Sequence, residues 1–382
     1  MRSTLAVLVA ALALLAGCTA ATGPTESPAP LAGDGDPVNL RGDCPTTVVI
    51  QTNWWPQAEY GALYRLLGPN RRPDKARKAV AAPLVSDGKD TGVELEIRSG
   101  GPAIAFTPAA TTLYLDSSVL LAGVDLDQVA RLSGEKPVRA VFAPMDASPV
   151  VLMWDPQTHP EFHSVADVGR SDARVLYFQG SVYMDYLTGA GVLKKSQVES
   201  SYDGTPARFV ADGGQTVQQA YVTNEVFQYE RELPQWRKPV GYGFVKDTGY
   251  PNYPEVFAVR TDREAELAPC LRKLVPILQR GAADYLADPG PTNRIVSDLV
   301  DEFDGFPYSV QRADHAAKVM RENGIMGNGN DAAVGDLDPA KAGRLLDLVR
   351  PIFAAQGTPV PDGTGVEQLL TNAYIDPSIG VR

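Results

Sequence analysis

Residues 52–64, which read TNWWPQAEYGALY, gather side chains that could hold a flat ligand. They follow a short β-branched run at residues 48–51 and contain Trp54 and Trp55, two of the four tryptophans of the chain. The face of an indole can stack on an aromatic ring, a contact worth about 0.5–1.5 kcal/mol beyond the burial of surface. The stretch therefore predicts a binding corner for a flat ring.

The position of this corner between predicted elements supports the same interpretation. Pro56 suits the first turn of a helix, so the corner joins the end of a strand to the start of a helix. Ligands of open α/β sheets lie beyond the carboxyl ends of the strands, where first-turn amides lack partners within the helix. Asn53 and Gln57 could hydrogen-bond ring nitrogens or an amide. Because neighbouring residues of extended backbone face opposite sides, we expect Trp54 at the ligand and Trp55 in the core.

Two polar pairs elsewhere in the chain are further candidates. Gly180 and Ser181 open a helix-like segment, where glycine lets a ligand approach the backbone and the hydroxyl can bind it or merely cap the helix. Tyr183 follows and could line a cleft or pack in the core. Asn224 and Glu225 follow a strand, and the carboxylate could accept an amino group of a ligand. The alternative for this pair is a helix N-cap with a first-turn glutamate.

Histidine chemistry finds little support in the sequence. His159 and His163 have the spacing of metal ligands, but Pro160 breaks the helix that would align them. The third histidine, His315, is expected to face solvent on an amphipathic helix. With three histidines and no G-x-S-x-G motif, a serine hydrolase is disfavoured, and we expect no metal, no cofactor and no catalysis.

Strands that alternate with helices must position these residues. Strands are predicted at residues 93–101, 111–115 and around 138–154, and the chain turns mostly helical after about residue 262. Such alternation indicates an α/β fold with mostly parallel sheets. The length of 382 residues suggests two to three domains, and the net charge of −11 argues against nucleic acid as a partner.

The first residues have the features of an export signal. An early positive charge precedes an apolar run at residues 5–15, which is too short to span a bilayer comfortably. The small residues before Cys18 resemble a bacterial lipobox, so we expect residues 1–17 to be removed and Cys18 to carry lipid. Residues 18–44 are rich in Thr, Pro, Gly and Ala and are predicted to be a flexible tether. In an oxidising compartment Cys44 and Cys270 predict one disulfide, with two free thiols as the alternative.

The order of these motifs resembles solute-binding proteins of ABC importers, in the class that binds thiamine-pyrimidine precursors, nitrate, sulfonate and taurine. That family's corner reads Asp-Trp-aromatic-Pro-Asn-x-x-His-x-x-x-Tyr. This chain matches it at Trp54, Trp55, Pro56 and Tyr64, whereas Asn53, Gln57 and Tyr60 stand where the family has Asp, Asn and His. The segments YFQGSVYMDYL, AYVTNEVFQYE and GYPNYPEVFAVRTD resemble its glycine-serine loop, its Asn-Glu segment and its return crossing. Residues 68–92 and the C-terminal third are longer than the family usually has.

The resemblance implies a type 2 periplasmic-binding-protein fold, an α/β fold of two lobes joined by two crossing segments. Lobe one would combine residues 45–148 with 245–382, and lobe two would span residues 149–244. Tyr60 and Tyr250 become further candidates, the second lining the cleft or stiffening the hinge. The implied protein is a lipid-anchored, extracytoplasmic monomer that delivers a flat nitrogen heterocycle to an ABC permease. The alternatives are a sulfonate or nitrate binder, disfavoured because no cleft candidate is basic, a lipoprotein enzyme of pyrimidine metabolism, and a binding lipoprotein that serves a sensor.

Overall fold

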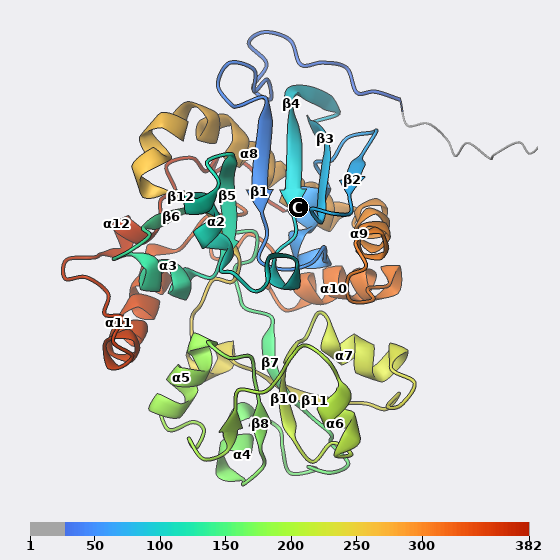
Figure 1. Cartoon of the computed structure of the whole chain (residues 1–382), viewed down its shortest axis with the longest axis vertical. Helices are drawn as coiled ribbons and strands as arrows, with labels where there is room; N and C mark the ends of the chain where they lie inside the picture. The colour runs from blue at the N-terminus through green and yellow to red at the C-terminus, as the bar shows by residue number, and fades with distance from the viewer. Residues whose placement is uncertain (1–26, 382) are drawn as a thin grey trace, which may run out of the picture.

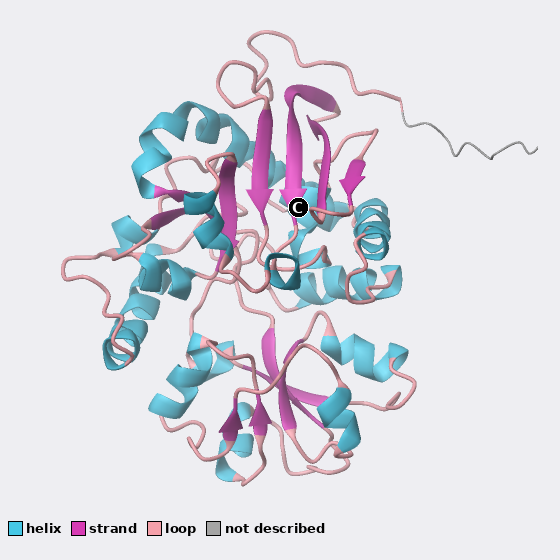
Figure 2. Cartoon of the chain, in the orientation of Figure 1, coloured by secondary structure: helices cyan, strands magenta, loops and turns pink. Residues whose placement is uncertain are grey.

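Two separate β-sheets organise residues 27–381, the part of the chain that the computed structural model describes. The predicted signal peptide and Cys18 lie outside the described residues. Figure 1 shows the two sheets one above the other, and Figure 2 shows helices flanking each of them. No helix within residues 27–381 is long and apolar enough to cross a membrane.

The larger sheet has the strand order β2-β3-β4-β1-β5-β12-β6. Its strands are β1 (Thr47–Gln51), β2 (Arg72–Asp74), β3 (Ala79–Ser86), β4 (Lys89–Arg98), β5 (Val119–Val124), β6 (Val138–Phe142) and β12 (Val256–Arg260). β1 pairs in parallel with β4 and β5, whereas β12 runs antiparallel between β5 and β6. The central strands are continuous apolar runs because both faces are covered, as in buried parallel sheets.

The smaller sheet has the order β11-β7-β10-β8-β9. Its strands are β7 (Val150–Trp154), β8 (Val175–Leu176), β9 (Val198–Glu199), β10 (Val217–Tyr221) and β11 (Gly241–Phe244). The chain enters this sheet after β6 and returns to the larger sheet after β11. Two segments therefore connect the sheets, residues 143–149 and residues 245–255. Below, the bodies built on the larger and the smaller sheet are called lobe one and lobe two.

Helices cover the faces of both sheets (Figure 2). Lobe one carries α1 (Gly61–Tyr64), α2 (Ala109–Leu115), α3 (Leu126–Leu132), α8 (Glu264–Ala287), α9 (Gly290–Glu302), α10 (Val310–Glu322), α11 (Pro339–Ala355) and α12 (Val366–Leu369). Lobe two carries α4 (Val165–Arg170), α5 (Val182–Gly189), α6 (Ala207–Ala211) and α7 (Glu225–Phe227). Short helical turns complete the set at η1 (Ala58–Tyr60), η2 (Gly101–Ile104), η3 (Gln228–Glu232), η4 (Lys246–Thr248) and η5 (Thr261–Arg263).

Two glycines let α1 and α8 pack closely. A Cβ atom on Gly61 would lie 2.4 Å from the ring of Tyr285, and one on Gly281 would lie 2.4 Å from the carbonyl oxygen of Ala62. Because real Cβ atoms do not approach that closely, the two backbones can meet only where both positions lack a side chain. This packing fixes the helix that follows the Trp54–Trp55 corner.

One segment folds differently from its sequence-based prediction, and another forms strands where the sequence allowed no prediction. Residues 111–115, predicted as a strand, belong to α2, where the Thr112 hydroxyl donates to the Ala109 carbonyl and Leu113 is buried. Burial of the Ala110 and Leu113 face on β5 outweighs the strand propensity of the two threonines. Residues 68–92, which are longer than the resembled family usually has, form β2, β3 and the start of β4 at the edge of the larger sheet.

The predicted tether is folded from residue 27 onward. Ala32, Val38 and Leu40 are buried, and Leu31 forms a bridge with Asp90 at the start of β4. The prediction of flexibility is therefore wrong for residues 27–44, because these few apolar residues find partners on lobe one despite their lack of periodicity.

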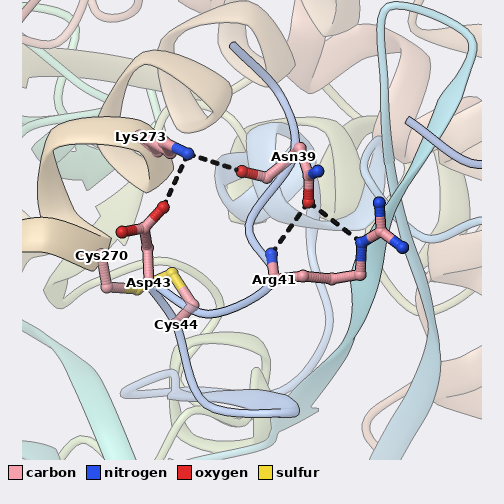
Figure 3. The surroundings of a disulfide bond; sticks show 6 residues. All are labelled: Asn39, Arg41, Asp43, Cys44, Cys270 and Lys273. Carbon is pink, nitrogen blue, oxygen red and sulfur yellow. Dashed lines mark hydrogen bonds and ion pairs between the residues drawn. A yellow bond between two sulfur atoms is a disulfide. The ribbon is translucent and has the colours of Figure 1, made fainter. Parts of the chain in front are cut away.

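A disulfide fastens this segment to α8. Cys44 and Cys270 are joined across 226 residues of sequence, with their Cα atoms 4.6 Å apart (Figure 3). Lys273, one turn further along α8, donates to the Asn39 carbonyl at 3.0 Å and pairs with Asp43 at 2.6 Å. Covalent and ionic contacts together hold residues 39–44 against the helix.

Candidate functional site

A cavity of about 230 Å³ lies between the lobes and is named here the aromatic chamber. Lobe one supplies residues 53–57, Asp125, residues 306–308 and Arg312, while lobe two supplies Phe178, Gln219, Tyr221, Asn224 and Glu225. Glu255 enters from the segment that returns to lobe one. Since drug-sized ligands occupy pockets of about 300–1,000 Å³, this chamber fits a smaller molecule.

The Trp54–Trp55 corner is fixed by two glycines at the end of the neighbouring strand. The amide of Gly100 donates to the Trp54 carbonyl at 2.9 Å, and the Thr52 hydroxyl donates to the same oxygen at 2.8 Å. A Cβ on Gly101, whose φ is +57°, would lie 2.4 Å from the Trp54 ring. The glycine pair that ends β4 thus makes room for the indole at the carboxyl ends of β1 and β4.

Trp54 joins aromatic rings from both lobes. Its ring centroid lies 6.1 Å from that of Phe106, 6.3 Å from that of Phe306 and 5.9 Å from that of Phe178 of lobe two. Phe106 and Phe306 are exposed, which places this cluster at the surface end of the chamber. The contact with Phe178 is edge-on, a favoured arrangement for aromatic pairs, and it spans the gap between the lobes.

Trp55 also lines the chamber, although it is buried. Trp55 packs in the hydrophobic core, as expected, and it reaches the chamber as well. The corner is a loop rather than a strand, so the alternation of strand side chains does not apply. The indole Nε1 of Trp55 is buried and has no hydrogen-bond partner among the described residues.

The other candidates of the corner divide into two groups. Asn53 and Gln57 line the chamber, whereas Tyr60, predicted as a ligand residue, does not. Tyr60 is fully buried on η1, and its hydroxyl donates to Asn53 Oδ1. Tyr60 therefore lies behind the chamber and orients Asn53 instead of contacting a ligand.

Asn224 and Glu225 line the chamber from lobe two. One carboxylate oxygen of Glu225 accepts from the Tyr202 hydroxyl at 3.0 Å and the other from the Tyr221 amide at 2.7 Å. Asn224 stands at the N-cap of α7, but its side-chain oxygen accepts from Arg312 at 2.9 Å and does not cap the helix. The pair therefore has the predicted N-cap and first-turn positions, but the Asn224 side chain makes no capping bond.

The remaining candidates lie in an adjoining cavity of about 190 Å³, named here the polar chamber. Gly180, Ser181, Tyr183 and Tyr250 line it, and both chambers share Asp125, Gln219 and Tyr221. The hydroxyl of Ser181 makes no capping bond to α5, so capping does not occupy it. The sequence-predicted residues are thus divided between two neighbouring spaces.

Several residues of the site were missed by sequence reasoning. Asp125 ends β5, and Glu255 precedes β12, 130 residues later, yet the Glu255 amide donates to Asp125 Oδ1 at 3.1 Å. Arg312 of α10 lines the chamber, which corrects the expectation of a cleft without a basic residue. Its Nε donates to Glu232 of lobe two at 2.8 Å. Asp125 had a local signal as an acidic residue between a strand and a helix, but nothing local marked Arg312 or Glu255.

Burial raises the pKa of several carboxyl groups around the chambers. The pKa of Glu225 is raised by burial, and that of Glu255 is raised well above its usual range by burial and by the nearby charges of Glu59 and Asp125. In the polar chamber, burial and Asp125 raise the pKa of Asp127 to about 7. The site therefore favours neutral carboxyl groups unless a positive charge enters.

The histidines lie away from both chambers. His159 stacks on Phe162 with ring centroids 4.5 Å apart, and no group of metal-binding side chains occurs among residues 27–381. His315, expected to face solvent, is half-buried with its ring 5.0 Å from Phe227 of lobe two. Burial lowers the pKa of His315.

Comparison with known proteins identifies the fold. No protein-family model matches the chain, and no curated protein matches its sequence. The alkanesulfonate-binding protein SsuA from Xanthomonas axonopodis pv. citri, solved with MOPS bound, aligns over 86% of this chain and 98% of its own, with 10% identity and a TM-score of 0.53. The aliphatic sulphonate-binding protein SsuA from Escherichia coli aligns over 85% and 92%, with 13% identity and a TM-score of 0.53. The nitrate-binding protein NrtA from Synechocystis PCC 6803 aligns over 86% and 87%, with 12% identity and a TM-score of 0.52. The chain therefore has the periplasmic-binding-protein fold, as the sequence predicted.

Proposed function

We propose that this chain is an extracytoplasmic solute-binding protein of an ABC importer and that it holds a small, flat nitrogen heterocycle between its lobes. The observation that carries the proposal is the aromatic chamber, whose walls come from both lobes. The Trp54 ring of lobe one meets Phe178 of lobe two at 5.9 Å beside Asn53 and Glu225, which can hydrogen-bond a heterocycle.

The contacts between the lobes suit a protein that closes on its solute. Thr223 of lobe two donates to Glu59 of lobe one, and Arg312 of α10 pairs with Glu232 of lobe two. A solute that contacts both walls favours the conformation in which these contacts form. A permease could then distinguish loaded from empty protein by the distance between the lobes.

An anion binder is the alternative for which a specific observation exists, since Arg312 lines the aromatic chamber. Two of the similar structures are named as sulfonate binders and one as a nitrate binder. However, Glu232 already pairs with Arg312, and Asp125, Glu225 and Glu255 line the same chamber. This excess of carboxyl groups favours a heterocycle with N–H donors over an anion.

The remaining parts of the proposal concern location and partners. A lipid on Cys18 would hold the protein on the extracytoplasmic face of the cell membrane, where an ABC permease is its partner. We propose that it acts as a monomer and that it binds its solute without changing it. An enzyme of pyrimidine metabolism would instead convert the bound molecule.

A thermal-shift screen of the mature protein against pyrimidines, flavins, MOPS and nitrate tests this function. We expect a heterocycle to raise the unfolding temperature and to be recovered unchanged by chromatography. Trp54→Ala should weaken its binding about fivefold, because about 1 kcal/mol of stacking is lost. Trp236→Phe, in lobe two away from both chambers, is the control and should bind normally. Stabilisation by MOPS or nitrate alone, unaffected by Trp54→Ala, would contradict the heterocycle, and recovery of a converted product would contradict the binding role.

A further inference from the structure

Glu255 occupies an unusual position in the wall of the aromatic chamber. It is 2% exposed, and its backbone has a φ of +56°, a left-handed conformation that residues other than glycine seldom adopt. Its Oε2 atom is buried and has no hydrogen-bond partner within residues 27–381. Leaving a buried carboxyl oxygen unpaired is costly, so this oxygen points to a partner that comes with the ligand.

The charged groups around Glu255 leave it without a cation. Asp125 and Glu225 line the same chamber, and Glu59 lies behind it. Arg312 is the cationic side chain that lines the chamber, and its guanidinium donates to Glu232 at 2.8 Å and to Asn224 at 2.9 Å. The positive charge of this side chain is therefore directed at lobe two rather than at Glu255.

The rest of the wall suits a flat cation that also accepts a hydrogen bond. The faces of aromatic rings attract positive charge, and Trp54, Phe178 and Phe306 gather around one end of the chamber. Trp55 Nε1 is a buried donor without an acceptor in the described part of the chain. The residues that carry this unpaired acceptor and this unpaired donor, Glu255 and Trp55, line the same chamber.

We propose that the solute is a flat organic monocation that donates an N–H to Glu255 and accepts a hydrogen bond from Trp55. The proposal rests on the solute-binding function proposed above and specifies the charge of its ligand. A protonated amino-heterocycle with a second ring nitrogen has this combination of a delocalised positive charge, N–H donors and a remaining acceptor. A sulfonate, a nitrate or an unprotonated ring lacks the positive charge.

The proposal implies that a proton leaves as the cation binds. Burial raises the pKa of Glu255, the like charges of Glu59 and Asp125 add to this, and the Tyr60 hydroxyl opposes it. The Glu255 carboxyl group is therefore neutral in the empty protein up to a higher pH than an ordinary glutamate. It ionises when the cation arrives, and its proton passes to solvent. Affinity should rise with pH below that pKa, by up to about tenfold per pH unit for one released proton.

Three pyridines that share a ring and differ in charge provide the test. 4-Aminopyridine is a cation at neutral pH that has the positive charge and the N–H donors but no acceptor for Trp55, 4-hydroxypyridine is neutral, and pyridine-4-carboxylate is an anion. By calorimetry at millimolar concentration we expect the cation to bind at least about tenfold more tightly than the other two. Titrations in buffers of different ionisation enthalpy should show proton release. Glu255→Gln should abolish both the preference and the proton release, whereas the control Asp336→Asn, a carboxyl whose pKa burial also raises but which lines neither chamber, should keep both.

Several outcomes would overturn the inference. These are equal or tighter binding of the neutral or anionic ring, an unchanged preference in Glu255→Gln, and no binding of 4-aminopyridine. The broader solute screen separates this failure from a failure of the proposed function. If a neutral or anionic solute binds and Trp54→Ala weakens its binding, the proposed binding function holds. Only the proposal of a cationic solute is then contradicted. The absence of any bound solute would contradict both.

Discussion

Asp127 gives the structure a dependence on pH that can be predicted with a sign and a magnitude. Its carboxyl accepts from the Tyr250 hydroxyl at 2.7 Å and from the Asn252 amide at 3.2 Å, yet its Oδ1 has no partner among the described residues. Burial is the main cause that raises the pKa of this group from 3.8 to about 7, and the neighbouring Asp125 adds to it. Between these two values the folded protein binds more protons here than the unfolded chain.

The free energy of unfolding must therefore fall as pH rises through this interval. A difference of about three pKa units corresponds to about 4 kcal/mol in total, of which about 2–3 kcal/mol is lost between pH 5 and pH 8. Asp127→Asn keeps the shape of the side chain and removes its proton equilibrium. From pH 5 to pH 8 the wild-type protein should lose about 2–3 kcal/mol more stability than this variant.

Urea unfolding of the ligand-free protein, followed by circular dichroism at several pH values, measures this difference. Asp116→Asn is the control, because hydrogen bonds from Ser118 and Arg98 lower the pKa of Asp116 to about 2. Asp116 is therefore ionised throughout the interval, and its variant should follow the slope of the wild-type protein. Parallel curves for the wild-type protein and Asp127→Asn would refute the argument that burial keeps this carboxyl neutral.

Two further predictions concern the packing of lobe one. Replacing both Cys44 and Cys270 by serine should lower the free energy of unfolding in urea by about 5 kcal/mol, because the bond closes a loop of 226 residues; an unchanged midpoint would contradict this. Gly281→Ala should destabilise by about 1–3 kcal/mol, since its Cβ would lie 2.4 Å from the backbone of α1. The matched change Gly343→Ala in α11, where the nearest atom is 3.6 Å away, should stabilise by about 0.5–1 kcal/mol. Both glycine changes are measured by the same urea unfolding experiment. Equal effects of the two glycine changes would refute the packing argument.

The sequence predicted those parts of the site that depend on neighbours in the chain. The corner at Trp54 could be placed because a strand, a proline and a helical stripe surround it within a few residues. The pairing of Cys44 with Cys270 could be anticipated because two cysteines remain once Cys18 is set aside. The mixed α/β fold followed from the alternation of apolar runs.

The parts that were missed depend on contacts between distant segments. Asp125 and Glu255 meet only because β12 pairs with β5 in the larger sheet. No sequence pattern near either residue predicts that pairing. Arg312 reaches the chamber because the loop between α9 and α10 returns toward lobe two, which helical periodicity cannot show. Leu40 is buried in a segment whose composition is typical of a linker, because one side chain can find a pocket without any repeating pattern.

The position of β12 also determines the order in which the protein can assemble. β6 pairs with no other strand of residues 27–381 than β12, which arrives more than 100 residues later in the chain. All strands of the smaller sheet lie within residues 150–244 and need nothing from outside this range. A chain that is synthesised from its N-terminus can thus complete the smaller sheet first. Until β12 has formed, the edges of β5 and β6 that pair with it stay without hydrogen-bond partners. Open apolar edges invite aggregation, so the chain is most prone to aggregate in the interval before β12 has formed.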